Sequence, residues 1–222
     1  VAGFYDNVVP LGPAERKAIA EAPDNDAKLL RTFGLAAPHG GGKKLLELLN
    51  EPSLNIDGLQ SGWTGAQAKT IIPDTASASL DMRLVKNAGP DQEFNRLVAH
   101  IRKQGFYVID REPTMEERAK YAHIAEVTHD NGYPATRTPM DLPISQALMR
   151  VVDASTSQPA VKIPLIGGSV PMYIFNDMGL PVIGVPIVNF DYNQHSANEN
   201  LRIGNLWTGV EIYAGILAEL RW

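Results

Sequence analysis

The sequence contains no cysteine among its 222 residues. Disulfide bonds, thiolate zinc sites and cysteine nucleophiles are therefore excluded, and any metal must be held by histidine, aspartate or glutamate. No apolar run is long enough to cross a bilayer, and the formal net charge of −5 argues against nucleic acid or an anionic membrane as the main partner. What remains is the composition of a soluble globular protein, with length for one large domain or two modest ones.

The first residues, Val1–Asp6, include no initiator methionine, no basic segment and no apolar signal segment. They read as the end of a strand entered midway. Our hypothesis from this pattern is that the chain is a fragment, or one piece of a processed polypeptide. Any signal peptide would then lie upstream, so the sequence does not distinguish a cytoplasmic protein from a periplasmic or secreted one.

The first half of the chain predicts an α+β sheet with helices on one face. Proline at helix starts, glycine at helix ends and apolar spacing carry this interpretation. The predicted elements are two helices over 13–33 divided at Pro23, a helix after residue 44, strands over 53–59, 68–72 and 76–84, a helix from Pro90 to Gly105 and a strand over 106–109. The strand over 76–84 alternates apolar and polar residues, which is typical of an antiparallel strand with one packed face.

The second half predicts part of a mainly parallel α/β sheet, because helices alternate with continuous apolar segments. The expected helices cover 142–154, 171–178 and 205–220, and the clearest expected strand covers 180–188. In the last helix, the expected inward stripe is Leu206, Val210, Tyr213, Leu217 and Leu220. Between the halves, the polar segment Arg111–Arg118 predicts a linker, in which Glu116 and Glu117 are interpreted as a solvated pair.

His195 is the first candidate for a site residue. It lies in a polar loop, Gln194–Asn200, directly after the apolar segment 180–188 and before the closing helix. Loops held by rigid elements often carry functional residues, and histidine is a common metal ligand. An ordinary solvated loop histidine remains the alternative.

Gly167, Gly168 and Ser169 precede an expected helix. Two glycines let the backbone approach a ligand, and free N–H groups at a helix start favour an anion such as a carboxylate. A tight structural turn is the alternative. Ser169 has no histidine and aspartate at motif spacing, so a serine nucleophile is disfavoured.

Arg83 and Thr70 are further candidates. Arg83 lies on the polar face of its expected strand, where a guanidinium can grip a carboxylate with two hydrogen bonds. A surface ion pair with Asp81 is the alternative. Thr70 stands at a strand end, where its hydroxyl can contact a ligand or a neighbouring carbonyl.

Several motifs that are weak singly occur together in one order. They are Gly3–Asp6, Asn55–Leu59 with Gly62–Gly65, Lys69–Pro73, Arg83–Val85, Gly167–Pro171 and His195–Glu199. The set resembles the dizinc metallopeptidases related to carnosine dipeptidase, glutamate carboxypeptidase, acetylornithine deacetylase, succinyl-diaminopimelate desuccinylase and aminoacylase. The carnosine dipeptidase-like branch is the most similar.

The resemblance implies a zinc-binding catalytic domain interrupted by a smaller α+β lid, which also forms a homodimer. Residues 1–118 would be most of the lid, an antiparallel sheet with helices on one face. Residues 119–222 would be the C-terminal part of a mainly parallel α/β zinc-peptidase domain. The implied activity is hydrolysis of the amide bond of a dipeptide or N-acyl amino acid with a free carboxylate.

The resemblance also implies roles for single residues. His195 matches the last ligand of a two-zinc centre. Thr70 and Arg83 match lid residues that hold the substrate's carboxylate, and Ser169, with Gly167 and Gly168, matches a contact to the same substrate. No catalytic residue is implied within the chain.

Two features depart from the family. The other metal ligands and the general base would lie upstream of Val1, so the 222 residues are expected to be inactive alone. Ile166 stands where close relatives often carry glutamate, which leaves substrates other than dipeptides open. The alternative from another class is a non-catalytic dimerisation or ligand-binding module, and a serine hydrolase is a distant third.

Overall fold

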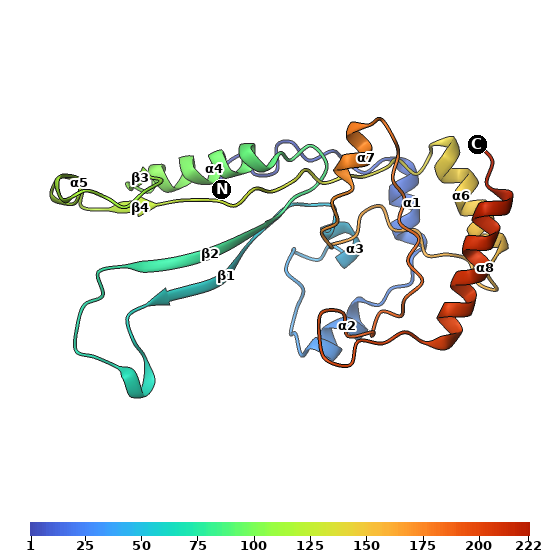
Figure 1. The fold of residues 1–222 in the computed structure, drawn as a ribbon, viewed down its shortest axis with the longest axis horizontal. Coiled ribbons are helices and arrows are strands. Elements are labelled where there is room, and N and C mark those ends of the chain that lie inside the picture. Colours follow the sequence, from blue (N-terminus) through green and yellow to red (C-terminus); the bar gives the residue numbers. More distant parts are fainter. The chain divides into compact units, whose positions relative to one another are not determined.

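The computed structural model describes residues 1–222, which form two compact units of a mixed α/β fold. Unit 1 contains 1–9, 49–135 and 167–173, and unit 2 contains 10–48, 136–166 and 174–222. The chain, traced in Figure 1, therefore passes between the units five times, after residues 9, 48, 135, 166 and 173. Each unit is built from segments that are distant in sequence. The expected functional division at residues 118 and 119 stays a prediction.

Unit 1 carries a long antiparallel hairpin of β1 (Ser53–Ser61) and β2 (Ala76–Arg83), seen as an extended arm in Figure 1. Its register pairs Ser53 with Arg83 at one end and Ser61 with Ala76 at the other. A bulge between Ile56 and Gly58 adds one residue to β1.

The bulge keeps the apolar residues of the hairpin on one face. Ile56 pairs with Leu80 before it, and Leu59 pairs with Ala78 after it. Ile56, Leu59 and Leu80 are 68%, 77% and 40% exposed, so the chain does not cover this face. The alternation of β2 is confirmed, but the expectation of a packed face is wrong for these 222 residues.

The rest of unit 1 is built around α4 (Pro90–Lys103), which begins with proline and ends before the left-handed Gly105 as expected. A second, parallel sheet pairs β3 (Tyr107–Ile109) with β4 (Ile124–Glu126) across α5 (Met115–Lys120). The predicted linker is thus partly helical, and the expected single sheet is two separate ones.

The predicted strand over 68–72 does not form. The hairpin loop contains a single 3-10 turn, η1 (Gly65–Gln67), and then irregular turns. Gly62 and Gly65 have left-handed backbone, and a Cβ at Gly62 would meet the Pro73 ring at 2.8 Å. The loop therefore turns back on itself where the apolar residues alone suggested an extended strand.

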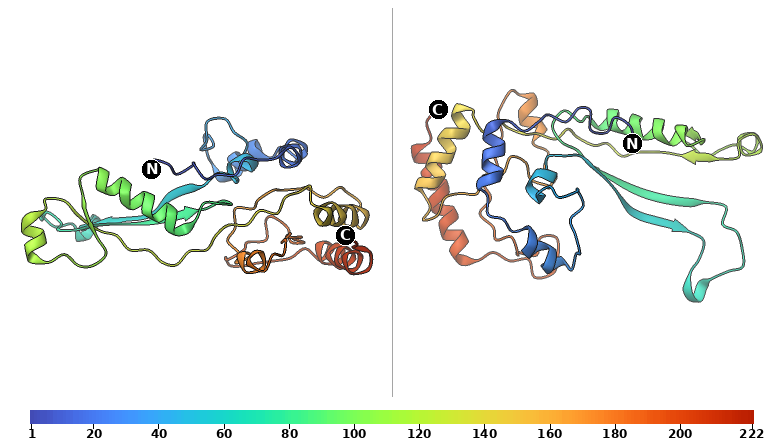
Figure 2. Two further views of the ribbon diagram at one scale, coloured as in Figure 1. Left: turned by 90° about the horizontal axis from the view of Figure 1, so that it is seen from above. Right: turned by 180° about the vertical axis from the view of Figure 1, so that it is seen from behind.

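Unit 2 is helical. Its helices are α1 (Pro13–Glu21), α2 (Asp26–Phe33), α3 (Leu45–Leu48), α6 (Pro143–Ala154) and α8 (Ile203–Glu219), with α7 (Tyr173–Asp177) starting at the unit boundary. The division of α1 from α2 near Pro23 and the left-handed Gly34 after α2 confirm the predicted breaks. Figure 2 shows α6 and α8 side by side.

The core of unit 2 lies between α6 and α8. Leu148, Val152 and Ile212 are each 8% exposed and form its centre. Ala160, Val185, Ile216 and Leu220 pack against them. Gly215 faces Ser155 so closely that a side chain there would collide with its hydroxyl, which explains the close approach of the two helices.

Two expectations for unit 2 are wrong. Residues 180–188 form no strand, because no other strand pairs with them. Their hydrogen bonds to distant segments are made by side chains: the Thr138 hydroxyl bonds Val182, and the Tyr213 hydroxyl donates to Val185 O. The buried side of α8 contains Gly209 and Ile212, whereas Leu206, Val210, Tyr213 and Leu217 are exposed; only Leu220 of the expected stripe packs on the core. Since α8 is apolar on most sides, spacing alone could not select its packed face. None of the helices has the length and apolar character of a membrane span.

The start of α5 yields a prediction about acid stability. Thr114 and Glu117 form a reciprocal capping box, and the hydrogen bond from Arg111 is the main reason that the pKa of Glu117 falls from 4.5 to about 2. A depressed pKa stabilises the folded state above the unfolded pKa, and this contribution is lost as the pH falls towards the folded pKa. Glu117→Gln should therefore lower the midpoint of urea unfolding at pH 7, and the difference from wild type should disappear between about pH 4.5 and about pH 2.

Glu116→Gln is the matched control, because Glu116 is an exposed carboxylate on the same helix outside the capping box. An equal effect of both substitutions at pH 7 would contradict the assignment.

Candidate functional site

Arg83 and Ser169 lie together in unit 1, although 86 residues separate them in sequence. Arg83 is the last residue of β2, and its Nη1 donates to the Ser169 hydroxyl at 2.9 Å. Its Nε donates to Asp81 Oδ2 at 2.6 Å. The structure thus joins two of the predicted substrate-binding residues in one contact. It also contains the Asp81 ion pair that was the alternative for Arg83.

The polar face of the hairpin continues beyond this contact. The register places Ser53 opposite Arg83 and Asn55 opposite Asp81, and Asn55 Nδ2 donates to Ser53 Oγ at 3.2 Å. We refer to Ser53, Asn55, Asp81, Arg83 and Ser169 as the polar cluster. Ser53 and Asn55 were not proposed as site residues from the sequence, because the residues that lie opposite them are set by the strand register. Their alternation with the apolar Leu54 and Ile56 was a signal that could have identified them as part of a polar face.

Gly167 has a packing role in the same region. A Cβ at this position would lie 2.9 Å from Leu49 Cδ2, so any larger residue would require the Leu49 side chain to shift. The helix expected at Pro171 begins instead at Tyr173 and has five residues, after a tight turn from Val170 to Met172. A helix dipole therefore does not support anion binding here. A substrate role for Gly167 and Gly168 stays a prediction.

Thr70 lies in the hairpin loop, far from the polar cluster. It is exposed at the centre of a three-residue turn, in which Ile71 N donates to Lys69 O at 3.0 Å. The eight residues of β2 separate this loop from Arg83, which corresponds to roughly 25 Å at the usual rise of a strand. One unit 1 therefore cannot present both residues to the same small ligand.

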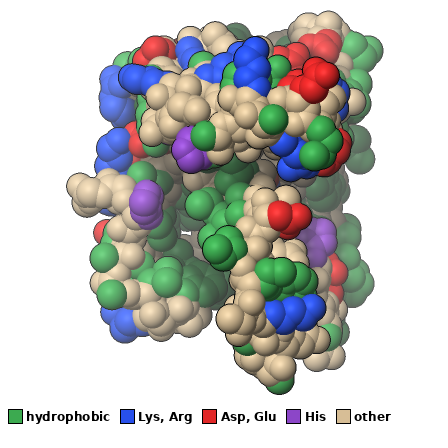
Figure 3. All heavy atoms as spheres, turned by 90° about the vertical axis from the view of Figure 1, so that its left-hand side faces the viewer, with side chains coloured by type: hydrophobic (Ala, Val, Ile, Leu, Met, Phe, Trp, Pro, Cys, Tyr) green, Lys and Arg blue, Asp and Glu red, His purple; other side chains and the backbone are tan.

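The loop around Thr70 exposes apolar groups. Lys69 Nζ lies 4.1 Å from the centre of the Trp63 ring, and Ile71 and Ile72 are 60% and 91% exposed. Figure 3 views the molecule from the side on which the hairpin arm ends, and hydrophobic side chains lie open there among charged ones. Such exposed apolar loops are typical of surfaces that contact another protein.

His195 belongs to unit 2 and sits in a strained turn. Asn193, His195 and Asn198 have φ values of 57°, 61° and 61°, in the left-handed region that side chains other than glycine seldom occupy. Three such residues within six positions cost free energy that the surrounding contacts must offset, and this kind of strain is concentrated at functional sites. The His195 side chain is exposed.

Asn189 anchors the His195 loop at both ends. Its side chain is 4% exposed, and Nδ2 donates to Asp191 Oδ1 at 3.0 Å and to Asn200 Oδ1 at 3.1 Å. Its Oδ1 accepts from Arg202 N at 3.1 Å. The hydrogen bond from Asn189, aided by the Arg202 guanidinium, lowers the pKa of Asp191. Sequence reasoning missed this anchor because nothing in the sequence marks one asparagine as buried among the many polar residues that follow it.

His195 is not part of a metal site within the chain. Nowhere in residues 1–222 do three or more histidine, aspartate or glutamate side chains gather as metal ligands. A catalytic zinc requires at least three protein ligands in one place. The residues present therefore do not make up a zinc site by themselves, and the role of His195 as one ligand stays a prediction.

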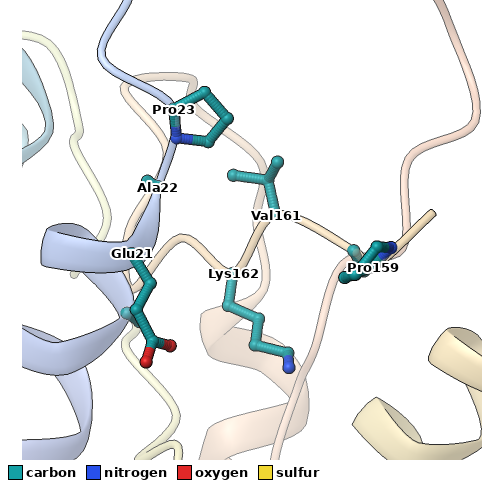
Figure 4. Close-up of a pocket in the computed structure, with 8 residues that line it drawn as sticks. Glu21, Ala22, Pro23, Pro159, Val161 and Lys162 are labelled. Atoms are coloured by element: carbon teal, nitrogen blue, oxygen red, sulfur yellow. The ribbon is translucent and has the colours of Figure 1, made fainter.

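A cavity of about 290 Å³ in unit 2 contains none of the predicted residues. It lies between the end of α1 and residues 159–162, and Figure 4 shows Pro23 and Val161 close together with the Glu21 and Lys162 side chains extending away from them. Lys162 is engaged by Asp153 at 3.1 Å. With mainly apolar walls and its lysine already paired, this cavity is not the candidate site.

Comparison with known proteins shows what the chain is similar to. Residues 16–106 match the family model described as a peptidase dimerisation domain. The chain is 25% identical over 221 residues to the Cys-Gly metallodipeptidase DUG1 of Candida albicans, covering 98% of this chain and 43% of that protein. Residues 16–106 are thus similar to the M20 peptidase dimerisation domain, and almost the whole chain is similar in sequence to a metallodipeptidase.

Solved structures agree with this M20 relationship. The M20 family metallo-carboxypeptidase Sso-CP2 from Sulfolobus solfataricus superposes with a TM-score of 0.78 at 27% identity, covering 99% of this chain and 47% of that one. Human carnosine dipeptidase 1, at 19% identity, shares the fold with a TM-score of 0.65, covering 99% of this chain and 45% of that one. The resemblance read from the motifs is confirmed, and the chain spans less than half the length of these relatives.

The loop anchor gives a prediction about local stability. Asn189→Ala removes two donors and one acceptor from a buried position. Leaving their partners unsatisfied should destabilise the loop by about 1–3 kcal/mol. Hydrogen exchange of the amides between residues 190 and 201 should become faster, while the amides of α6 should change little.

Asn176→Ala is the control, because Asn176 is an exposed amide side chain in the same unit. Unchanged exchange in the loop of Asn189→Ala would show that Asn189 is not the anchor.

Proposed function

We propose that this chain is the C-terminal portion of an M20 metallopeptidase that hydrolyses the amide bond of a dipeptide or N-acyl amino acid with a free carboxylate. The observation that supports this most is the hydrogen bond between Arg83 and Ser169. Both residues match substrate-binding positions of the family, and they meet although they come from distant segments. A family relationship alone does not require that contact.

In this proposal, Arg83 binds the terminal carboxylate of the substrate. Its side chain is 52% exposed, so a ligand can reach it. A planar guanidinium offers parallel N–H groups that match the two oxygens of a carboxylate, and a charged hydrogen bond of this type is stronger than a neutral one. Ser169 holds the opposite side of the guanidinium and presents a hydroxyl next to the same position.

His195 would supply one ligand of the metal site. A single imidazole does not bind a catalytic zinc, so the proposal takes the remaining ligands from the part of the peptidase that this chain does not span. The relatives are more than twice as long as the aligned chain, which leaves room for those residues. The strained and anchored turn would hold the His195 ring in a fixed direction.

Thr70 would act on the substrate bound by a second copy of the protein. The hairpin separates Thr70 from Arg83 within one unit 1, so a shared substrate requires two subunits. The match to a peptidase dimerisation domain and the exposed apolar loop around Thr70 support a homodimer of this kind. Each site would then combine Arg83 of one subunit with Thr70 of the other.

The carboxylate contact can be tested in the full-length enzyme that contains this chain. Arg83→Ala should lower kcat/KM between about tenfold and a hundredfold, because a charged hydrogen-bonding partner of the substrate is lost. The loss should be much smaller for the same substrates with an amidated C-terminus. Arg102→Ala, which removes an exposed arginine from α4, should leave both values unchanged. Equal activity of wild type and Arg83→Ala would refute the assignment and favour a non-catalytic dimerisation module.

The two-subunit site predicts complementation. Thr70→Ala and Arg83→Ala enzymes should each be impaired as homodimers. In a mixed dimer, one of the two sites combines intact Arg83 with intact Thr70, so mixing should restore a fraction of activity approaching half of the wild-type value per mixed dimer. Activities measured after subunit exchange, with each variant exchanged against itself as the control, would show this. A mixture no more active than the average of the two variants would rule out sharing of the site.

A further inference from the structure

We propose that Asp81 is a positioning residue that sets the orientation of Arg83 and so determines preference for a free carboxylate. The inference rests on the function proposed above, in which Arg83 binds that carboxylate. Asp81 is not part of that proposed function, and its role here does not require it to contact the substrate.

The register of the hairpin holds the two side chains together. Residues two apart in a strand point to the same face, and Asp81 and Arg83 are two apart near the end of β2, where the ladder is regular. Their contact, 2.6 Å between Nε and Oδ2, is as short as a strong charged hydrogen bond. Asn55 lies opposite Asp81 on the neighbouring strand.

Two contacts on different nitrogens fix the plane of the guanidinium. Asp81 accepts from Nε, and Ser169 accepts from Nη1 on the far side of the group. Because the guanidinium is rigid and planar, holding it at two nitrogens prevents rotation about the end of the side chain. Neither bond uses Nη2, and Nη1 keeps a second N–H group, so the two terminal nitrogens can still donate to the two oxygens of a ligand carboxylate.

A purely stabilising surface ion pair accounts less well for Asp81. Exposed ion pairs add little to stability, and both side chains of this pair are at least one-third exposed. Aspartate is also disfavoured in strands. In addition, its negative charge weakens the attraction of Arg83 for any anion. Asp81 is therefore useful only if the orientation of the Arg83 guanidinium matters more for binding than the net charge of the pair. A guanidinium of fixed orientation favours a planar carboxylate over anions of other shapes.

The experiment uses the full-length enzyme and compares dipeptides and N-acetyl amino acids with their C-terminal amides. Asp81→Ala should lower kcat/KM for the free carboxylates by about tenfold, the size expected for coupling between contacting residues, and should reduce their advantage over the amides. Asp81→Asn keeps an oxygen that accepts from Nε and should recover most of the activity. Asp57→Asn removes an exposed carboxylate at the bulge of the same hairpin and should have no effect.

A double-substitution cycle separates the possible failures. If Asp81 acts through Arg83, Asp81→Ala should have no further effect in the Arg83→Ala enzyme. An equal effect in both backgrounds, or a changed melting temperature with an unchanged preference for carboxylates, would overturn the Asp81 inference. If Arg83→Ala lowers kcat/KM but Asp81→Ala does not, only the Asp81 inference fails. If Arg83→Ala has no effect, the proposed function itself fails.

Discussion

The hydrogen bond from Arg83 to Ser169 is the contact on which the arrangement of unit 1 depends most for function. It connects the end of β2 to a segment of seven residues that returns from unit 2. Gly167 of that segment lies against Leu49, and Arg83, which contacts Ser169, is also bound by Asp81. The candidate substrate-binding side chains of Arg83 and Ser169 are therefore brought together by the packing of distant segments and not by a local sequence motif.

Arg83 in unit 1 and His195 in unit 2 are stabilised in different ways. At Arg83, a strand and an ion pair hold the side chain, and the backbone is regular. At His195, the backbone is left-handed, and the buried amide of Asn189 holds the loop. A regular strand tolerates exchange of its side chains, whereas a strained turn depends on every hydrogen bond that closes it. The His195 loop is for this reason the more sensitive of the two to substitution at residues that never contact a ligand.

Most helices of this protein could be predicted from sequence, because their ends are marked by chemistry. Proline begins α1, α4 and α6, and glycine follows α2 and α4 closely. These signals are local and do not depend on the rest of the fold. The family resemblance was equally accessible, because it used the order of several short motifs.

The failures have a common physical cause: the features concerned depend on partners that the local sequence does not specify. Residues 180–188 have the composition of a strand, but a strand exists only beside another strand. Contact with α6 determines which side of α8 is buried, and the bulge in β1 determines which of its side chains lie on each face of the hairpin. For the site, residue types suggested Arg83 and Ser169, and the sequence also offered Asp81 as an ion-pair partner of Arg83. Only the register could reveal Asn55 and the distance to Thr70. Asn189 was invisible because its importance comes from burial.

The five passages between the units also govern the order in which the protein can form during synthesis. Hairpin β1–β2 and helix α4 are synthesised before residues 167–173, so unit 1 lacks its final segment until residue 173 has been added. Contacts between such distant segments close large loops and form slowly. Unit 1 is therefore incomplete, and Arg83 has no Ser169 to bind, until its last segment has been made. Such a partly formed unit is prone to aggregation.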